Sequence, residues 1–438
     1  MIDQANPVLA CGHCLEYERV NRRTFLTGVI QSPAMLFPNG IAAFPAWMPR
    51  IALADPQVGL RGDTLVCIFL RGGADGLNVI IPHGDENYYM LRPTIGVPRP
   101  DDSKAKVKVL DLDGFFGLHP ALGALKPIYD AGKLAPVQAT GSPDQTRSHF
   151  EAMALMERGA TTSAYSGWLA RHLSTLDTGN NSALRAVAIS DMLPASLTGA
   201  VTATALQSIG DYHLRARDEN GEALRAAIEA MYQEQDDLLT SAAWQTLASI
   251  DVLSRIDMKG YQPGGRTYPE SDFGRALQTT AQLIHVDVGV EVACVDIGGW
   301  DTHAAQGSAE GQMARVMADL GDGLAAFYED LGAEIENVTV VVMSEFGRRA
   351  HENAALGTDH GHGNMMLVIG DGIAGGKVYS RWPGLHPDQL VGPGDLAITT
   401  DYRDVLGEVL AKRLNNPQMD QVFPGYAANP LGLAVPRM

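Results

Sequence analysis

Residues 65–78 read LVCIFLRGGADGLN, an apolar run that passes directly into a glycine-rich loop. Four to eight apolar residues closed by turn residues are typical of a strand that is buried on both faces of a sheet. In α/β folds, ligands bind beyond the carboxyl ends of such strands. We therefore predict a central strand here and take Asp75, on the loop that follows it, as a candidate metal ligand. The alternative is an ordinary Asp-Gly turn.

Five further apolar runs of this kind follow, at residues 134–139, 186–190, 291–297, 338–344 and 365–370. Helical stretches lie between them, notably residues 221–258 and 306–331. Strands that alternate with helices indicate a mainly parallel sheet with helices on both faces. The predicted fold class is therefore α/β, and residues 191–289, which are mostly helical in pattern, are predicted to form an insertion or cap.

The bulk composition excludes some classes of partner. The chain has 438 residues and a formal net charge of −18, without a cluster of Lys and Arg, which argues against a nucleic-acid partner. Of the four cysteines, Cys11 and Cys14 lie near the N-terminus, whereas Cys67 and Cys294 sit inside apolar runs. This distribution does not indicate a disulfide framework, and a single CxxC pair is only a weak metal signal.

The N-terminus has the pattern of an export signal. Residues 21–26 read NRRTFL, and an acid-free, largely apolar stretch runs from there to an A-x-A cleavage site at residues 52–54. We predict a twin-arginine-type signal over residues 1–54, a mature chain over 55–438, and a periplasmic or secreted location. The alternative is a basic N-terminal arm, since prolines interrupt the apolar stretch. No later run is long enough for a membrane span.

Two strand-end loops carry acidic and imidazole side chains. Residues 298–303, GGWDTH, place Asp301 two residues before His303, and residues 357–363, GTDHGHG, hold Asp359, His360 and His362. Oxygen and nitrogen ligands in this mixture suit zinc, manganese or iron better than calcium. We take these five side chains as candidate ligands of a divalent metal ion. The alternative for Asp301 and His303 is a capped turn, and the alternative for residues 357–363 is a hydrogen-bonded loop that braces the site.

Two other segments carry candidate catalytic groups. Residues 344–349, SEFGRR, bring Glu345 as a further candidate ligand and Arg348 as a guanidinium suited to phosphate, sulfate or carboxylate, unless it only pairs with nearby acids. Residues 146–151, TRSHFE, open a predicted helix, where backbone N–H groups favour an anion. Ser148, or Thr146, is therefore a candidate nucleophile, and the alternative is an N-cap. His149 is a candidate general acid or base.

One apparent cofactor motif is rejected. Residues 370–375, GDGIAG, match the glycine pattern of dinucleotide sites, but the residues that follow predict a short strand, whereas such sites require a helix. We interpret the segment as a turn and predict no nicotinamide cofactor.

Taken together, the segments RGGADGLN, RSHFEAM, GGWDTH, SEFGRR, TDHGHGN, GGKVYSRWPGL and TTDYRDVLGEVL, with the RRTFL leader, resemble the domain-of-unknown-function 1501 family. These are exported bacterial proteins grouped with the alkaline phosphatase and sulfatase superfamily. The resemblance spans about residues 22–410 and implies an alkaline phosphatase-like three-layer sandwich. It also implies a first-strand aspartate, a hydroxyl or thiol nucleophile at a helix start, and two metal sites built from Asp and His.

The resemblance maps Asp75 onto the first-strand aspartate, and it maps Asp301, His303, Asp359, His360 and His362 onto later metal ligands. The chain departs from the superfamily at residues 345–346, where Glu-Phe stands in place of the common Asp-His, so that one imidazole ligand is missing or comes from the loop at Asp359. It also lacks a Cys-x-Pro-x-Arg motif, which excludes a formylglycine nucleophile.

Two functions are compatible with these residues. The first is a metal-dependent hydrolase that acts on a small anionic phosphate or sulfate ester, in which Arg348 or Arg71 stabilises the charge of the transition state. The second is a non-catalytic exported binding or assembly protein with an eroded metal site and an unknown protein partner. The Glu345-Phe346 departure favours the second function.

Overall fold

The computed structural model describes residues 64–160, 164–200, 203–210, 221–232, 238–254, 256 and 260–437. The predicted export signal at residues 1–54, including Cys11 and Cys14, lies outside the described residues. Within the described ranges, no helix is both long and apolar enough to cross a membrane.

An eight-stranded sheet forms the centre of the fold, in the order β11-β5-β10-β9-β1-β8-β6-β7. The strands are β1 (Thr64–Leu70), β5 (Leu134–Gly141), β6 (Ala186–Ala188), β7 (Thr204–Ala205), β8 (Val292–Ile297), β9 (Val338–Ser344), β10 (Asn364–Gly370) and β11 (Thr400–Asp401). Neighbouring strands pair in parallel except where β10 meets β5 and β9. The predicted mainly parallel sheet is therefore confirmed. A second, three-stranded sheet joins β2 (Ile80–Ile81), β4 (Gly117–Leu118) and β3 (Leu110–Asp111).

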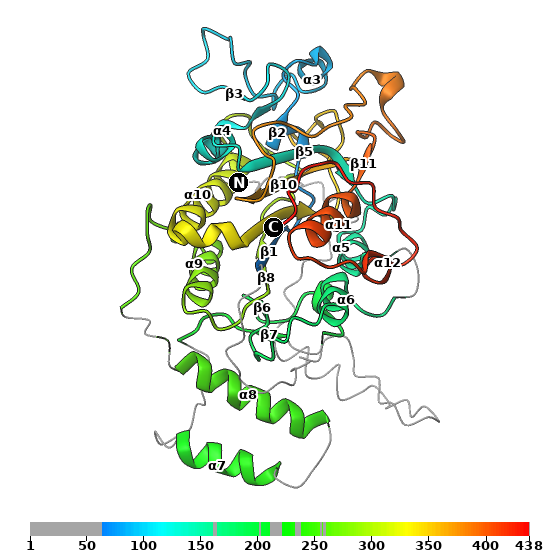
Figure 1. Cartoon of the computed structure of the whole chain (residues 1–438). Coiled ribbons are helices and arrows are strands. Elements are labelled where there is room, and N and C mark those ends of the chain that lie inside the picture. The colour runs from blue at the N-terminus through cyan, green and yellow to red at the C-terminus, as the bar shows by residue number, and fades with distance from the viewer. Residues whose placement is uncertain are drawn as a thin grey trace, which may run out of the picture. The chain divides into compact units, whose positions relative to one another are not determined.

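Helices cover both faces of the central sheet, because its inner strands are apolar on both sides. In β1, Val66, Ile68 and Leu70 belong to one apolar cluster, which also contains side chains of α9 (Asp272–His285) and α10 (Gln312–Leu331). The alternate residues of β1 face a second cluster, with side chains of α5 (His149–Arg158), α6 (Trp168–Thr175), α11 (Tyr402–Lys412) and α12 (Met419–Val422). Figure 1 shows these two helical layers on either side of the strands. The three-layer arrangement predicted from the sequence is confirmed.

The remaining α-helices are short or lie within residues 191–289. They are α2 (Gly76–Val79), α3 (Glu86–Leu91), α4 (Lys126–Asp130), α7 (Gly221–Met231) and α8 (Leu238–Ser254). The stretch predicted as helical over residues 221–258 is divided into α7 and α8. In the stretch predicted over 306–331, α10 starts only at Gln312, because Gly307 and Gly311 adopt positive φ angles of 86° and 133°. The boundaries 191–289 for the insertion stay a prediction.

Strand direction brings the polar loops to one edge of the sheet. The loops after β1, β5, β8 and β9 leave the carboxyl ends of strands that all run the same way. Because β10 runs in the opposite direction, the loop that precedes it, residues 359–363, reaches the same edge. Four loops that are distant in sequence therefore meet there, and the loop between β9 and β10 contributes both of its ends.

Candidate metal centre

Three imidazole rings surround one carboxylate at this edge. His149, Asp301 and His360 each offer a ligand atom, and these atoms all lie within 4.8 Å of one another. His303 joins them, since its Nε2 lies 3.1 Å from Asp301 Oδ1 and 2.8 Å from His360 Nε2. The four side chains come from the start of α5, the loop after β8 and the loop before β10. We call them the His–Asp cluster.

Each ring of the cluster faces an acceptor on its far side, and two of the rings are hydrogen-bonded to it. His149 Nδ1 lies 2.7 Å from Glu345 Oε1, and His360 Nδ1 lies 2.9 Å from the carbonyl oxygen of Arg147. His303 Nδ1 is 3.6 Å from Asp359 Oδ1. We assign the ring hydrogen to Nδ1 in each case, because these partners are acceptors. All three Nε2 atoms are then free to bind a metal ion at the centre, and outer acceptors of this kind are typical of metal-bound histidines.

This assignment leaves nitrogen lone pairs without a partner inside the cluster. The Nε2 atoms of His303 and His360 face each other at 2.8 Å. The Nε2 of His149 is buried without a hydrogen-bond partner among the described residues and lies 3.7 Å from Asp301 Oδ2. Facing lone pairs are stabilised by a cation between them, either a proton or a metal ion. The donor set of three nitrogens and one carboxylate therefore fits a divalent transition metal.

Electrostatics keep the carboxylates of this region ionised. Burial disfavours the charged form of Asp301, but contacts with the three histidines and the charge of Arg348 outweigh it and hold the pKa of Asp301 well below its usual range. In Glu345, burial also opposes ionisation, but the hydrogen bond with His149, the charge of His149 and backbone hydrogen bonds together outweigh it and lower the pKa of the carboxyl. Burial lowers the pKa of His360, whereas in His149 the two carboxylates overcome burial and raise the ring pKa to about 9. Asp301 and Glu345 therefore supply negative charge for a cation at this edge; without a metal ion that cation is the protonated His149 ring, whose Nε2 proton a bound metal ion would displace.

Arg348 is buried directly against the cluster. Its Nη2 lies 2.5 Å from Asp301 Oδ1 and also donates to the carbonyl oxygen of Gly72 at 2.5 Å. Its Nε donates to the carbonyl of Gly73 at 2.6 Å, and its Nη1 donates to that of Thr358 at 2.9 Å. Every nitrogen of the guanidinium is thus bonded to the protein. The arrangement positions Asp301 and two loops and leaves no open fork for a substrate.

Glu345, Asp359 and His362, all predicted as metal ligands, lie around the cluster. Glu345 is buried and, besides His149, accepts hydrogen bonds from the backbone N–H of Gly72 and the hydroxyl of Ser344, both at 2.9 Å. Asp359 faces His303, as described above. His362 Nε2 contacts the carbonyl oxygens of residues 142 and 144 at 3.0 and 2.9 Å and so holds the loop that leads to α5. The first two orient cluster histidines, and the third braces a neighbouring loop.

The structure does not bring Asp75 into the cluster. Its carboxylate is fully buried and forms a two-pronged ion pair with Arg92, at 2.6 and 2.9 Å, and it accepts a further hydrogen bond from Gln306 Nε2 at 2.7 Å. Gln306 Oε1 in turn accepts from the hydroxyls of Thr302 and Thr358. This network ties together the loops that carry Asp301 and Asp359. Arg92 and Gln306 were not predicted, because nothing in their spacing along the chain marks them as partners of Asp75.

Ser148 lies beside the cluster at the start of α5. It is the N-cap residue by position, but its side chain makes no capping hydrogen bond and is exposed. The hydroxyl of Thr146, the other candidate nucleophile, donates to Glu151 at 2.8 Å. Of the two, Ser148 has the hydroxyl that is not used to hold the helix start.

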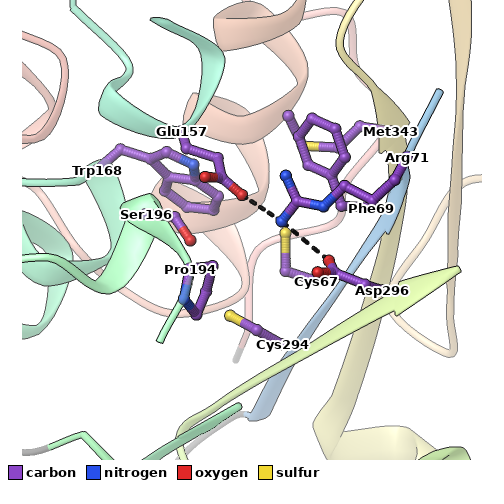
Figure 2. Close-up of a pocket in the computed structure, with 10 residues that line it drawn as sticks. All are labelled: Cys67, Phe69, Arg71, Glu157, Trp168, Pro194, Ser196, Cys294, Asp296 and Met343. Atoms are coloured by element: carbon purple, nitrogen blue, oxygen red, sulfur yellow. Dashed lines mark hydrogen bonds and ion pairs between the residues drawn. The ribbon is translucent and has the colours of Figure 1, made fainter. Parts of the chain in front are cut away.

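Arg71 forms an ion-pair network in a small pocket, which Figure 2 shows. Its Nη2 lies 2.6 Å from Glu157 Oε1 and 3.0 Å from Asp296 Oδ1. Glu157 belongs to α5, so this network fastens that helix, with His149 at its start, to the end of β1. Cys67 and Cys294 line the same pocket, and burial raises the pKa of the Cys67 thiol to about 12, which leaves it protonated and unreactive at neutral pH.

The fold and the His–Asp cluster define an α/β protein with a candidate metal centre at the strand ends. Residues 63–415 match the model of DUF1501, a family described as protein of unknown function, and the chain belongs to that family. No curated protein matches the sequence.

Several solved structures are similar to this chain. Ps i-CgsB has 12% identity and a TM-score of 0.38, with 83% of this chain and 75% of that chain covered. The C-terminal periplasmic domain of EcEptC from Escherichia coli, in complex with Zn, has 11% identity and a TM-score of 0.36, with 86% and 91% covered. The alkaline phosphatase of the Antarctic bacterium TAB5 has 10% identity and a TM-score of 0.28, with 72% and 93% covered. At these scores the matches carry no conclusion about activity.

Proposed function

We propose that this chain is an exported, divalent metal-dependent hydrolase of phosphate or sulfate esters. One observation carries the proposal: the Nε2 atoms of three histidines converge on Asp301, while the Nδ1 atom of each ring faces an acceptor outside the cluster. Export rests on the twin-arginine pattern of residues 1–54 alone.

His149, Asp301, His303 and His360 would hold the metal ion. When bound, a zinc, manganese or iron ion supplies a Lewis acid that polarises an ester oxygen and lowers the pKa of a coordinated water or hydroxyl. Arg348 keeps Asp301 in place, and Glu345 keeps the His149 ring oriented so that its Nε2 faces the centre. These are positioning roles, because neither side chain has a free polar group directed at a substrate.

Ser148 is the nucleophile in this proposal. Its hydroxyl is exposed and precedes His149, and the first N–H groups of α5 favour an anionic ester at the same place. The Ser148 oxygen forms a bond to phosphorus or sulfur while the bond to the alcohol oxygen breaks, and the alcohol leaves with the serine proton. Water then cleaves the seryl ester, which restores the hydroxyl and releases phosphate or sulfate.

The non-catalytic alternative is favoured by one observation. Arg92 and Gln306 occupy the Asp75 carboxylate, so the first-strand aspartate that the superfamily uses as a ligand is not free here. The chain would then bind one metal ion or none. The loops at the carboxyl ends of the strands would instead bind a partner protein.

One experiment distinguishes these functions. Metal content is measured by mass spectrometry on the purified mature protein and on the double variant Asp301→Ala/His360→Ala, beside hydrolysis of nitrophenyl phosphate and nitrophenyl sulfate. The matched control is Asp272→Ala/His386→Ala, which removes the same residue types from exposed positions. Stoichiometric transition metal and ester hydrolysis in the parent and control, both lost in the cluster variant, are expected. A parent that holds no metal after growth with zinc, manganese and iron rules the hydrolase out.

A further inference from the structure

Arg348 and Arg349 are adjacent, but their guanidinium groups are used very differently. All three nitrogens of Arg348 donate to the protein. In Arg349, Nε is buried and has no hydrogen-bond partner within the described part of the chain. The nearest acidic contact of Arg349 is from Nη1 to Asp359 Oδ2 at 3.8 Å, which is too long for a hydrogen bond. The side of the fork formed by Nε and Nη2 is therefore unsatisfied.

The backbone fixes the place of Arg349 beside the cluster. Its N–H donates to the carbonyl oxygen of Asp359 at 3.0 Å, and its own carbonyl accepts from Arg92 at 2.9 Å. The Asp359 carboxylate that faces Arg349 also faces His303, at 3.6 Å. One carboxylate therefore separates the guanidinium from the nearest histidine of the cluster. The guanidinium therefore lies next to the atoms that would hold the metal ion, on the other side of the Asp359 carboxylate.

Asp359 does not neutralise Arg349 firmly. Its Oδ1 accepts a hydrogen bond from Asn353 Nδ2 at 3.0 Å, and the carboxylate is 43% exposed. An exposed ion pair at this separation contributes little, so an incoming anion displaces it at small cost. The side chain of Arg349 is 29% exposed, which leaves its end open to a ligand. Because Nε is buried, an anionic oxygen binds at the exposed end of the planar guanidinium.

We propose that Arg349 binds a second anionic group on the substrate, separate from the ester that is hydrolysed. The substrate class is then a phosphate or sulfate monoester that carries a carboxylate, or another phosphate or sulfate, within a few bonds of the ester. This inference rests on the hydrolase function proposed above. It gives Arg349 a contact with a second group of the substrate, whereas the sequence analysis expected Arg348 to stabilise charge on the ester itself.

The test compares two probes that differ by one charge. Ethyl phosphate is a simple monoester, and phosphoglycolate is a monoester of similar length that bears a carboxylate. Binding of both is measured by calorimetry on the metal-loaded full chain, with Ser148→Ala present in every protein so that neither ester is hydrolysed during the titration. We expect phosphoglycolate to bind roughly 10- to 100-fold more tightly, as a charge-assisted hydrogen-bonded pair provides. Arg349→Ala should lose that preference and keep the affinity for ethyl phosphate, and Arg349→Lys should keep part of the preference.

Arg275→Ala is the matched control, since that side chain is 62% exposed and its deletion changes the net charge equally. It should keep the full preference. Thermal melting of each variant verifies that it is folded. A wild type that binds both probes equally, or an Arg349→Ala variant that keeps the preference, overturns the inference and leaves the hydrolase function standing. Equal weakening of both probes by Arg349→Ala also overturns it. If neither probe binds and the protein holds no metal, the proposed function itself has failed.

Discussion

Glu345 provides the sharpest test of how the metal centre is built. Its Oε1 lies 2.7 Å from His149 Nδ1 and also accepts the backbone N–H of Gly72 at 2.9 Å. In Glu345→Gln, the amide oxygen can take the place of Oε1 and keep both bonds, while the amide nitrogen can face the hydroxyl of Ser344, which accepts as readily as it donates. The substitution therefore preserves shape and removes charge.

The loss of that charge should weaken metal binding without unfolding the protein. A carboxylate behind a metal-bound histidine raises the basicity of the ring, and removal of such a partner costs about 10- to 100-fold in metal affinity. That range corresponds to about 1.4 to 2.7 kcal/mol. Because Glu345 is buried, solvent cannot compensate for the loss of its charge next to His149. We expect Glu345→Gln to fall within this range and Glu345→Ala to lose more, since it also leaves His149 Nδ1 without an acceptor.

The assay is competition for zinc against a chelator of known affinity, with thermal melting of the metal-free forms measured in parallel. Glu291→Gln is the control: Glu291 is also buried, but it precedes β8 at the opposite end of the strand and pairs with Arg185. The control should bind zinc as the wild type does. An unchanged zinc affinity in Glu345→Gln would refute the idea that Glu345 orients and charges a ligand.

Two further predictions concern stability. Asp75→Ala should destabilise the fold by about 3 kcal/mol or more in urea unfolding, because it leaves Arg92 buried without its carboxylate, and the folded fraction should still bind metal. Burial, together with the charge of Arg185, lowers the pKa of His172 to about 3, so below the ordinary histidine pKa of about 6.5 only the unfolded chain takes up this proton. His172 therefore costs no stability above that pH and about 3 kcal/mol by pH 4, and His172→Gln should flatten the decline in stability between pH 7 and pH 4.

The strands were predictable because a strand that is buried on both faces consists of an uninterrupted run of apolar residues. The apolar run at residues 338–344 coincides with β9, and the run at 65–70 falls one residue short of β1, which starts at the polar Thr64. Helix starts were less predictable. The segment before α10 carries polar residues that are compatible with a helix, and only the backbone angles of Gly307 and Gly311 delay its start.

The sequence predicted that Asp and His side chains would gather at the strand ends. It predicted less well which of them would lie together in the His–Asp cluster. Asp301 and His303 follow a parallel strand, as expected, but His360 precedes its strand and reaches the same edge only because β10 is antiparallel. Nothing in the sequence reports that direction. His149 was predicted as an acid or base because it follows Ser148, whereas its position in the cluster depends on how α5 packs. Asp75 was selected for its place at a strand end, and its partner Arg92 could not be foreseen.

The two adjacent arginines show why such assignments need the structure. Residues 348 and 349 form antiparallel bridges with different segments, Arg348 with His360 and Arg349 with Asp395. In an extended segment, successive side chains point to opposite faces. The Arg348 guanidinium therefore points toward Asp301 and the backbone carbonyls around it, which accept from all of its nitrogens. The Arg349 guanidinium lies beside Asp359, and its Nε has no hydrogen-bond partner among the residues that the structure describes. A shift of one residue in this pairing would exchange the two roles, so substrate contact at this site is decided by register and not by residue type.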